Sequence, residues 1–340
     1  MKTKMLKVIS PEDKAAVQAA GEILRAGGLV AIPTETVYGL AANALDGAAV
    51  AKIFKAKGRP QDNPLIVHVA SLEEIPPLVS EFPEEARALA QAYWPGPLTI
   101  IMKKSALIPD EVSAGLDTVG IRMPSHPAAR AIIKAAGVPL AAPSANLSGS
   151  PSPTNASRVF GDMDGRIDAV ADGGDSGVGV ESTVITVAQN PPCLLRPGGI
   201  TLEQLEAVLG HVEVHPAVFE ALKAGQQAAS PGMKYKHYAP KTKVVLVKGT
   251  LEQFCNYVHG CDNCAALCFE GEQAAIGVPC AVYGRRGDAE SQAHGLFEAL
   301  RELDSFGRPI AYARYPESGG VGMAVLNRML RAAGFEVVEL

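Results

Sequence analysis

Short apolar segments alternate with helical patterns along the first two thirds of the chain. The apolar segments occupy residues 29–32, 65–69, 98–102, 118–123 and 139–142, and helical patterns occupy residues 15–27, 48–57, 84–93 and 127–137. Helices interleaved with short apolar strands indicate an α/β domain whose sheet is largely covered. Two later strands, residues 182–187 and 192–196, have no long helix between them. The sequence therefore predicts an α/β fold on a mixed sheet.

The character of the chain changes near residue 210. Thr201 and Gln204 form a capping-box pattern at the start of a closing helix, and a long connection, residues 211–242, follows. Connections longer than about 15 residues are usually linkers or lids. Strand and helix patterns then resume, without the G-x-G-x-x-G turn of dinucleotide sites. We predict a first domain over 1–210, a linker or active-site lid over 211–242, and a smaller Rossmann-like α/β domain over 243–340.

Length and charge limit the classes of function. A chain of 340 residues exceeds what one hydrophobic core usually serves, which agrees with two domains. The net charge of −5, from 31 cations and 36 anions, argues against a general nucleic-acid binder but leaves room for a local basic groove. The N-terminus lacks an apolar core of signal-peptide length, and no uninterrupted apolar window approaches 18 residues. We expect a cytoplasmic protein without membrane contact.

Four of the six cysteines lie close together, at Cys255, Cys261, Cys264 and Cys268. Their spacing admits a zinc site, but no second C-x-x-C pair and no H-x-x-x-H accompanies them. Cys268 lies within an apolar segment, and free cysteine is a common small core residue. We therefore predict no metal site here.

A cationic stretch precedes one of the apolar strands. Lys57-Gly58-Arg59-Pro60 ends a helical pattern, and the strand 65–69 follows. Arginine offers a planar fork to phosphate and lysine a compact charge, so the pair suits a polyphosphate. The alternative is a solvated cationic helix end. His68 alternates with apolar neighbours in the strand, where a lone histidine is more often structural than catalytic.

Hydroxyl-rich and glycine-rich loops follow several other predicted strands. These are residues 32–44 with Thr34 and Thr36, residues 139–154 with Ser144 and Asn146, and residues 172–184, followed by Arg196. Ligands of α/β folds bind at such strand ends, where backbone N–H groups can cradle phosphate. No Walker motif, metal-ligand set or Ser-His-Asp signature accompanies them. This pattern favours nucleotide chemistry performed by positioning and electrostatics.

Several motifs in order carry a family resemblance. They are PTETVYGL, KGRPxxNPL, IRMP, PSAN, GVEST, LLRPG and the linker SPGMKYKHYAP, between residues 33 and 240. Together they resemble the threonylcarbamoyl-AMP synthases, the YrdC-like family, in their two-domain form. Lys236 stands where the family pattern has arginine. The resemblance implies an open, twisted mixed sheet with a basic concave face, across which the linker folds back.

The resemblance also implies an activity. L-threonine, bicarbonate and ATP would give L-threonylcarbamoyladenylate and pyrophosphate, for threonylcarbamoyladenosine at position 37 of tRNA. ATP would be a substrate, with Mg²⁺ held by its phosphates. Implied partners are the downstream tRNA threonylcarbamoyl-transfer proteins, and direct contact with tRNA is left open. The alternatives are an RNA-binding protein with a basic groove, or a carbamoyl-transfer module like that of hydrogenase maturation factors.

Matching the family motifs residue by residue assigns roles in a site. Catalysis would fall to Lys57, Arg59, Ser144 and Asn146. ATP would be bound by Arg59, Asn63, Thr118, Ser144, Ser152, Arg196 and Tyr235, and L-threonine by Thr34, Thr36, His68, Arg122, Ala142 and Ser182. The attacking group, the carboxylate of N-carboxy-threonine, is already an anion, so the chemistry needs cations and exclusion of water more than a strong base.

Overall fold

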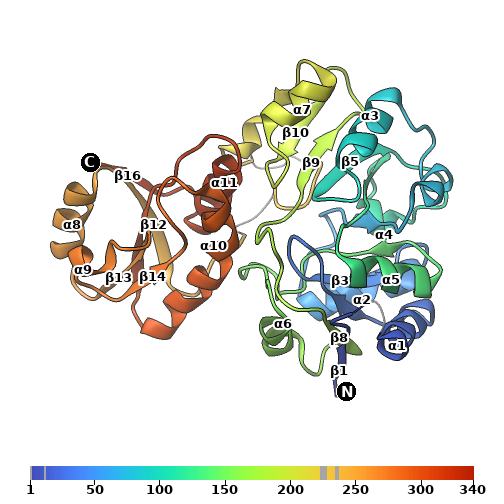
Figure 1. The fold of residues 1–340 in the computed structure, drawn as a ribbon, viewed down its shortest axis with the longest axis horizontal. Helices are drawn as coiled ribbons and strands as arrows, with labels where there is room; N and C mark the ends of the chain where they lie inside the picture. The colour runs from blue at the N-terminus through green and yellow to red at the C-terminus, as the bar shows by residue number, and fades with distance from the viewer. Residues whose placement is uncertain (1, 11–12, 223–227, 234–236) are drawn as a thin grey trace.

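The computed structural model describes residues 2–10, 13–222, 228–233 and 237–340, which form two α/β domains (Figure 1). The first contains one mixed sheet in the strand order β1-β8-β2-β3-β7-β4-β6-β5-β9-β10-β11. Its strands are β1 Lys4–Lys7, β2 Val30–Ile32, β3 Gly39–Asn43, β4 Ile66–His68, β5 Leu98–Lys103, β6 Thr118–Arg122, β7 Leu140–Ala141, β8 Ala169–Asp172, β9 Thr183–Thr186, β10 Cys193–Arg196 and β11 Glu213–Val214. Its helices are α1 Lys14–Arg25, α2 Gly47–Lys57, α3 Glu84–Tyr93, α4 Asp110–Ser113, α5 Pro127–Ala136, α6 Ala156–Met163 and α7 Leu202–Leu209.

This sheet contains both parallel and antiparallel pairs of strands. The pairs β1–β8, β2–β8, β4–β6, β5–β9 and β10–β11 are parallel, and β2–β3, β3–β7, β4–β7, β5–β6 and β9–β10 are antiparallel. The parallel pair β4–β6 places His68 beside Arg122 at the ends of the two strands. The predicted mixed sheet is confirmed. The ends of its central strands β4 and β6 bring polar residues together.

Local sequence explains where the helices that shape the site begin and end. The side chain of Asp46 accepts hydrogen bonds from the N–H groups of Ala48 and Ala49 at the start of α2. Gly58 ends α2 in the left-handed conformation, with φ of 62°, which places Lys57 and Arg59 on either side of a sharp change of direction. The expected capping box of Thr201 and Gln204 starts α7.

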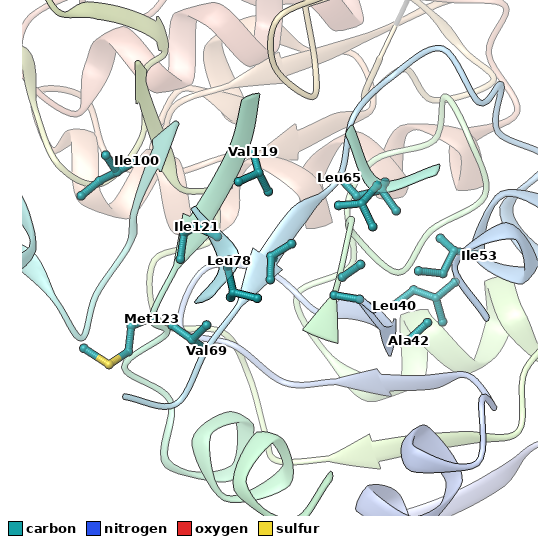
Figure 2. Packing of buried hydrophobic residues seen from close by; sticks show 14 of the residues in the cluster. Leu40, Ala42, Ile53, Leu65, Val69, Leu78, Ile100, Val119, Ile121 and Met123 are labelled. Carbon is teal, nitrogen blue, oxygen red and sulfur yellow. The ribbon is translucent and has the colours of Figure 1, made fainter. Parts of the chain in front are cut away.

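The main core of the first domain lies between one face of the sheet and its covering helices. Leu40 of β3, Ile53 of α2 and Ile121 of β6 belong to one buried cluster, part of which Figure 2 shows at close range. A second cluster, which includes Leu24 of α1 and Ile132 of α5, covers the other face. Apolar residues on both faces fix the sheet as a rigid support for the polar strand ends.

The second domain has a parallel sheet in the order β14-β13-β15-β12-β16. Its elements are β12 Lys243–Lys248, α8 Leu251–His259, β13 Cys264–Cys268, α9 Gln273–Ile276, β14 Cys280–Val282, α10 Ala289–Leu303, β15 Ile310–Arg314, α11 Gly322–Ala332 and β16 Val337–Glu339. Helices α10 and α11 lie on the side of the sheet that faces the first domain, and α8 and α9 lie on the other (Figure 1). This arrangement confirms the predicted second, smaller α/β domain.

The two domains share a buried cluster. Val37 and Val180 of the first domain and Tyr238 of the linker pack in one cluster with residues of α10 and α11. Strand β11 pairs with β10 in the first sheet although it lies within the predicted linker 211–242. The boundaries 1–210, 211–242 and 243–340 themselves stay predictions.

The cysteines of the second domain gather in one apolar cluster between α8 and the sheet. Cys264 and Cys268 are buried in the cluster under α8, and Cys255, Cys261 and Cys280 pack against it. All six cysteines of the chain are free, and within the described residues no group of three or more His, Cys, Asp or Glu is arranged to hold a metal ion. In the same described ranges, none of the helices combines the length and apolar character needed to span a bilayer.

Candidate active site

One pocket of the first domain gathers most of the predicted site residues. It is lined by side chains at the ends of α2, β4, β6 and β10 and in the loops after β2 and β7 and before β9: Thr34, Thr36, Lys57, Arg59, His68, Arg122, Ala142, Ser144, Asn146, Ser182 and Arg196. Segments separated by more than a hundred residues thus meet at one point, because the sheet brings their strand ends together.

Arg122 organises one side of this pocket. Its Nη2 forms an ion pair with Glu35 Oε1 at 2.7 Å, and its Nη1 donates to Thr36 Oγ1 at 2.9 Å. Thr36 Oγ1 in turn lies 2.9 Å from Thr34 Oγ1. Burial raises the pKa of the Glu35 carboxyl, but the charge and hydrogen bond of Arg122, together with backbone hydrogen bonds, outweigh burial and leave that pKa below its usual value. This side therefore presents a fixed guanidinium and two hydroxyls.

His68 lies beside Arg122 and is buried. Its Nδ1 is 3.2 Å from the carbonyl oxygen of Ile66, in its own strand. Burial, with the nearby charge of Arg122, lowers the pKa of His68 to about 3. The imidazole is therefore neutral near pH 7 and is a weak base. His68 therefore has the structural contact expected of a lone histidine in a strand, and it also lines the pocket.

Three further basic residues, Lys57, Arg59 and Arg196, form a cationic group in the lining of the pocket. Lys57 is buried, and its Nζ donates to the carbonyl oxygens of Ser144 and, at 2.6 Å, of Asn146. Burial, followed by the charge of Arg59, lowers the pKa of Lys57 well below its ordinary value. The amino group therefore fixes the backbone of the loop that carries Ser144 and Asn146. The sequence pattern indicated a cation here but not that its partners are backbone carbonyls.

Arg59 and Arg196 are the other two residues of this cationic group. Arg59 Nη2 makes two long hydrogen bonds of 3.3 Å to the carbonyl oxygens of Asn63 and Pro64, and its buried Nε has no hydrogen-bond partner among the described residues. Burial lowers the pKa of Arg59 to about 10, so the group stays charged near neutral pH. Arg196 donates from Nε to Ser182 O at 3.0 Å and from Nη2 to Ser182 Oγ at 3.1 Å. The arrangement suits a large anion.

The linker closes one wall of the pocket. Pro231, Gly232, His237 and Tyr238 line it together with the strand-end residues. Gly232 has a φ of +87°, and a Cβ at this position would lie 2.8 Å from Tyr238 Oη. The backbone of the linker therefore passes close to the pocket only because residue 232 is glycine. Tyr235 and Lys236, which the family pattern singles out, lie outside the described residues.

The chain is similar in sequence to known proteins over nearly its whole length. A family model described as telomere recombination, which groups Sua5, YciO and YrdC proteins, matches residues 22–198, and a model of the threonylcarbamoyl-AMP synthase C-terminal domain matches residues 200–334. The threonylcarbamoyl-AMP synthase of Pyrococcus abyssi is 45% identical over 95% of this chain and 96% of its own length. That of Bacillus subtilis is 47% identical over 100% of both chains. The chain belongs to the threonylcarbamoyl-AMP synthase family.

Solved structures agree with this assignment. The structure of P. abyssi Sua5 complexed with L-threonine matches with a TM-score of 0.91 and 42% identity, over 99% of this chain and 100% of that chain. The prediction of an L-threonylcarbamoyladenylate synthase, a nucleotidyltransferase that acts in tRNA modification with ATP as a substrate, is therefore confirmed, and it is favoured over the RNA-binding and carbamoyl-transfer alternatives.

Three residues that the family pattern assigns to ATP do not line the pocket of this threonylcarbamoyl-AMP synthase family member. Asn63 is buried at the turn beneath Arg59, and its carbonyl oxygen accepts from that arginine. Thr118 begins β6 and borders a separate small cavity. Ser152 is fully buried and donates to the carboxylate of Glu181. Their roles in binding ATP stay predictions.

Two acidic residues of the site carried little signal in the sequence. Glu35 lies within PTETVYGL and forms the ion pair with Arg122, and Glu181 lies within GVEST and is the one acidic residue lining the pocket within the described part of the chain. Both stand inside motifs that the sequence marked as polar. Their charge partners are distant in sequence, so the motifs alone did not identify what each carboxylate does.

Proposed function

We propose that this pocket condenses L-threonine, bicarbonate and ATP into L-threonylcarbamoyladenylate and pyrophosphate, with threonine beside Arg122 and the triphosphate beside Lys57, Arg59 and Arg196. The observation that carries the proposal is that one pocket is lined by four basic residues with different partners: Arg122 pairs with Glu35 and Thr36, whereas Lys57, Arg59 and Arg196 contact backbone carbonyls and Ser182. A single anion needs one of these two groups, whereas joining two anionic substrates needs both.

The first step forms the carbamate. The threonine ammonium group first loses one proton, and the resulting amine nitrogen then bonds to the carbon of bicarbonate as water leaves. The neutral His68, with its pKa of about 3, is a poor acceptor for this proton, so solvent or bicarbonate takes it. Arg122 suits the threonine carboxylate because its planar fork can hold both oxygens, and the hydroxyls of Thr34 and Thr36 lie on the same side.

The second step transfers the adenylyl group. A carbamate oxygen bonds to the α-phosphorus of ATP, the bond from that phosphorus to the bridging oxygen breaks, and pyrophosphate leaves. Mg²⁺ would be held by the phosphate oxygens and water rather than by protein side chains, and would offset part of the phosphates' negative charge. Arg59, with its unpartnered Nε, and Arg196 stabilise the developing negative charge, and Lys57 holds the loop of Ser144 and Asn146 in place.

The linker acts as a lid in this scheme. Pro231, Gly232, His237 and Tyr238 cover the pocket, and exclusion of water protects a carbamate that otherwise decomposes. The product then passes to tRNA threonylcarbamoyl-transfer proteins for modification at position 37. The cytoplasmic location stays a prediction.

One assay tests the proposed reaction. Purified protein is incubated with ATP, Mg²⁺, L-threonine and bicarbonate, without RNA, and both pyrophosphate and the adenylate are quantified. We expect equal amounts of the two products, and neither when threonine or bicarbonate is omitted. Pyrophosphate release that needs neither co-substrate, or that needs RNA, would contradict the proposal.

A glycine substitution tests the lid. Gly232→Ala places a Cβ against Tyr238 Oη, so the Tyr238 ring or the linker backbone must shift at the pocket wall, and ATP use should become uncoupled from adenylate accumulation. Gly174→Ala is the matched control, because Gly174 has nearly the same φ, +86°, with nothing within 4 Å of the added Cβ. Equal coupling in both variants would contradict the lid.

A further inference from the structure

The second domain reaches the wall of the pocket through one arginine of α11. Arg328 is fully buried, and its Nε donates to Glu181 Oε2 at 2.8 Å. Its Nη2 donates to the Glu181 carbonyl oxygen at 3.2 Å, and its Nη1 donates to the carbonyl oxygen of Pro197 at 2.8 Å. Most of the donors of this guanidinium are therefore directed at the first domain.

Glu181 connects this contact to the site. It lies just before β9 and lines the pocket, and its other oxygen, Oε1, accepts from the hydroxyl of Ser152. Burial raises the pKa of the Glu181 carboxyl, but the charges of Arg328 and Arg196, together with the hydrogen bonds from Ser152 and Arg328, outweigh burial and keep that pKa below its usual value. The pocket wall therefore contains an ionised carboxylate next to the side on which the cations lie.

A carboxylate in this position opposes the binding of a polyphosphate unless its charge is compensated. Repulsion between like charges is strong in a site largely shielded from water, and Glu181 would also draw Arg196 toward itself. A cation outside the pocket that pairs with Glu181 removes both effects. Arg328 occupies this position. Its Nε forms an ion pair with the Glu181 carboxylate, and its guanidinium carbon lies 5.7 Å from the centre of the Tyr238 ring on the linker.

We propose that Arg328 is a positioning residue for ATP binding, which neutralises Glu181 and fixes Ser152 from the second domain, so that Arg59 and Arg196 remain available to the phosphates. The second domain is then a working part of the ATP site. This inference rests on the proposed function and adds to it a task for α11.

A second ion pair between the domains provides the control. Arg158 of α6 and Glu298 of α10 are 2.9 Å apart with side chains 46% and 34% exposed, and neither lines the pocket. Arg158→Gln therefore weakens an interdomain contact without touching the charge balance of the site. Its kinetic constants should match those of the wild type.

The experiment is a charge rescue in the full-length protein. We expect Arg328→Gln to raise the KM for ATP by about tenfold or more, with the KM for threonine changed less than about threefold, because only the phosphate side meets the uncompensated carboxylate. Glu181→Gln in the same chain removes that carboxylate, so the double variant should recover most of the affinity for ATP. A general structural role would instead lower kcat and raise both KM values, and the double variant would be no better than the single one.

Two further measurements keep the test decisive. Should Arg328→Gln fail to fold, Arg328→Lys keeps the charge and must bind ATP within about threefold of wild type, as must the double variant. A tenfold loss in the lysine variant, an unchanged KM for ATP in Arg328→Gln, or no rescue overturns the inference. Wild-type protein assayed in parallel separates the questions, because absence of adenylate there contradicts the proposed function itself.

Discussion

The two domains bury arginine in different ways. In the second domain, Arg314 donates from Nε to Glu272 Oε2 at 3.0 Å, from Nη2 to Glu272 Oε1 at 3.3 Å and from Nη1 to Gly249 O at 2.9 Å. The rings of Phe254 and Phe269 lie within 5.7 Å of its guanidinium carbon. In the first domain, Arg59 has only two long bonds from one nitrogen, and its Nε is unpartnered among the described residues.

The difference separates a structural charge from one kept ready for a ligand. A buried guanidinium that two of its nitrogens hold on one carboxylate, as Arg314 is held on Glu272, is neutralised and offers little to an anionic substrate. An under-paired one costs stability in the free protein and is retained where a ligand completes its bonds. Arg59 lines the pocket of the candidate active site, which agrees with this distinction, whereas Arg314 does not line that pocket.

The largest effect on stability is expected at Arg314. Arg314→Ala leaves the buried carboxylate of Glu272 without its partner, which typically costs about 3–5 kcal/mol in the free energy of unfolding. Urea unfolding followed by circular dichroism measures this loss, and adenylate formation by the folded protein should stay within about threefold of wild type.

Lys248→Ala is the control for Arg314. Lys248 pairs with Glu339 at 3.0 Å, but both side chains are more than half exposed, so the loss should be small. A strong loss of activity in Arg314→Ala without loss of stability would reverse the assignment of roles.

Arg59 should show the opposite behaviour. Arg59→Ala removes a preorganised charge contact, so adenylate formation should fall by about a hundredfold or more, while the free energy of unfolding falls far less than in Arg314→Ala. Single-turnover formation of the adenylate measures the first quantity. Arg87→Ala, which removes an arginine on α3 that lies over the Phe82 ring, is the control. Near-normal rates in a folded Arg59→Ala protein would show that the anion site lies elsewhere.

The sequence predicted the architecture well because local patterns carry it. The rhythm of strands and helices, the capping box at Thr201 and the turn at Gly58 are local features, and each is present in the structure. The strand order is not local: β8 pairs with β1, and Ala169 lies opposite Lys4, which is 165 residues earlier in the sequence. Packing of whole helices over the sheet determines such neighbours, and a single sequence does not reveal them.

The same limit applies to the site. Strand-end polar residues such as Arg122 and Ser144 could be placed in one pocket from motif order and the family resemblance. Arg328 could not, because within its helix it looks like an ordinary surface cation, and its partner Glu181 is 147 residues away. Long-range ion pairs of this kind depend on how two domains dock.

Acid should destabilise the first domain through His68. Its folded-state pKa of about 3 lies below the usual 6.5, so the unfolded chain takes up the proton first. The stability that this residue contributes is complete above pH 6.5 and falls as the pH drops toward 3, by about 2 kcal/mol at pH 5. Urea unfolding at pH 7 and pH 5 measures the slope, which His68→Gln should flatten. The control is His211→Gln, on an exposed histidine, and an unchanged slope in His68→Gln would contradict the assignment.

The smallest effect is expected when the fork of Arg122 is replaced by a single charge. Arg122→Lys keeps the positive charge near Glu35 but cannot hold both oxygens of a carboxylate and also reach Thr36. Threonine affinity should therefore fall by about tenfold, and ATP affinity should change less than about threefold, because the phosphates lie beside the other cations. Calorimetry with each ligand separately measures both values. Glu35→Gln sharpens the result: it releases the guanidinium from its ion pair, so threonine affinity should not fall. A larger loss for ATP than for threonine in Arg122→Lys would move Arg122 to the nucleotide side and remove the division of the pocket into two charged halves.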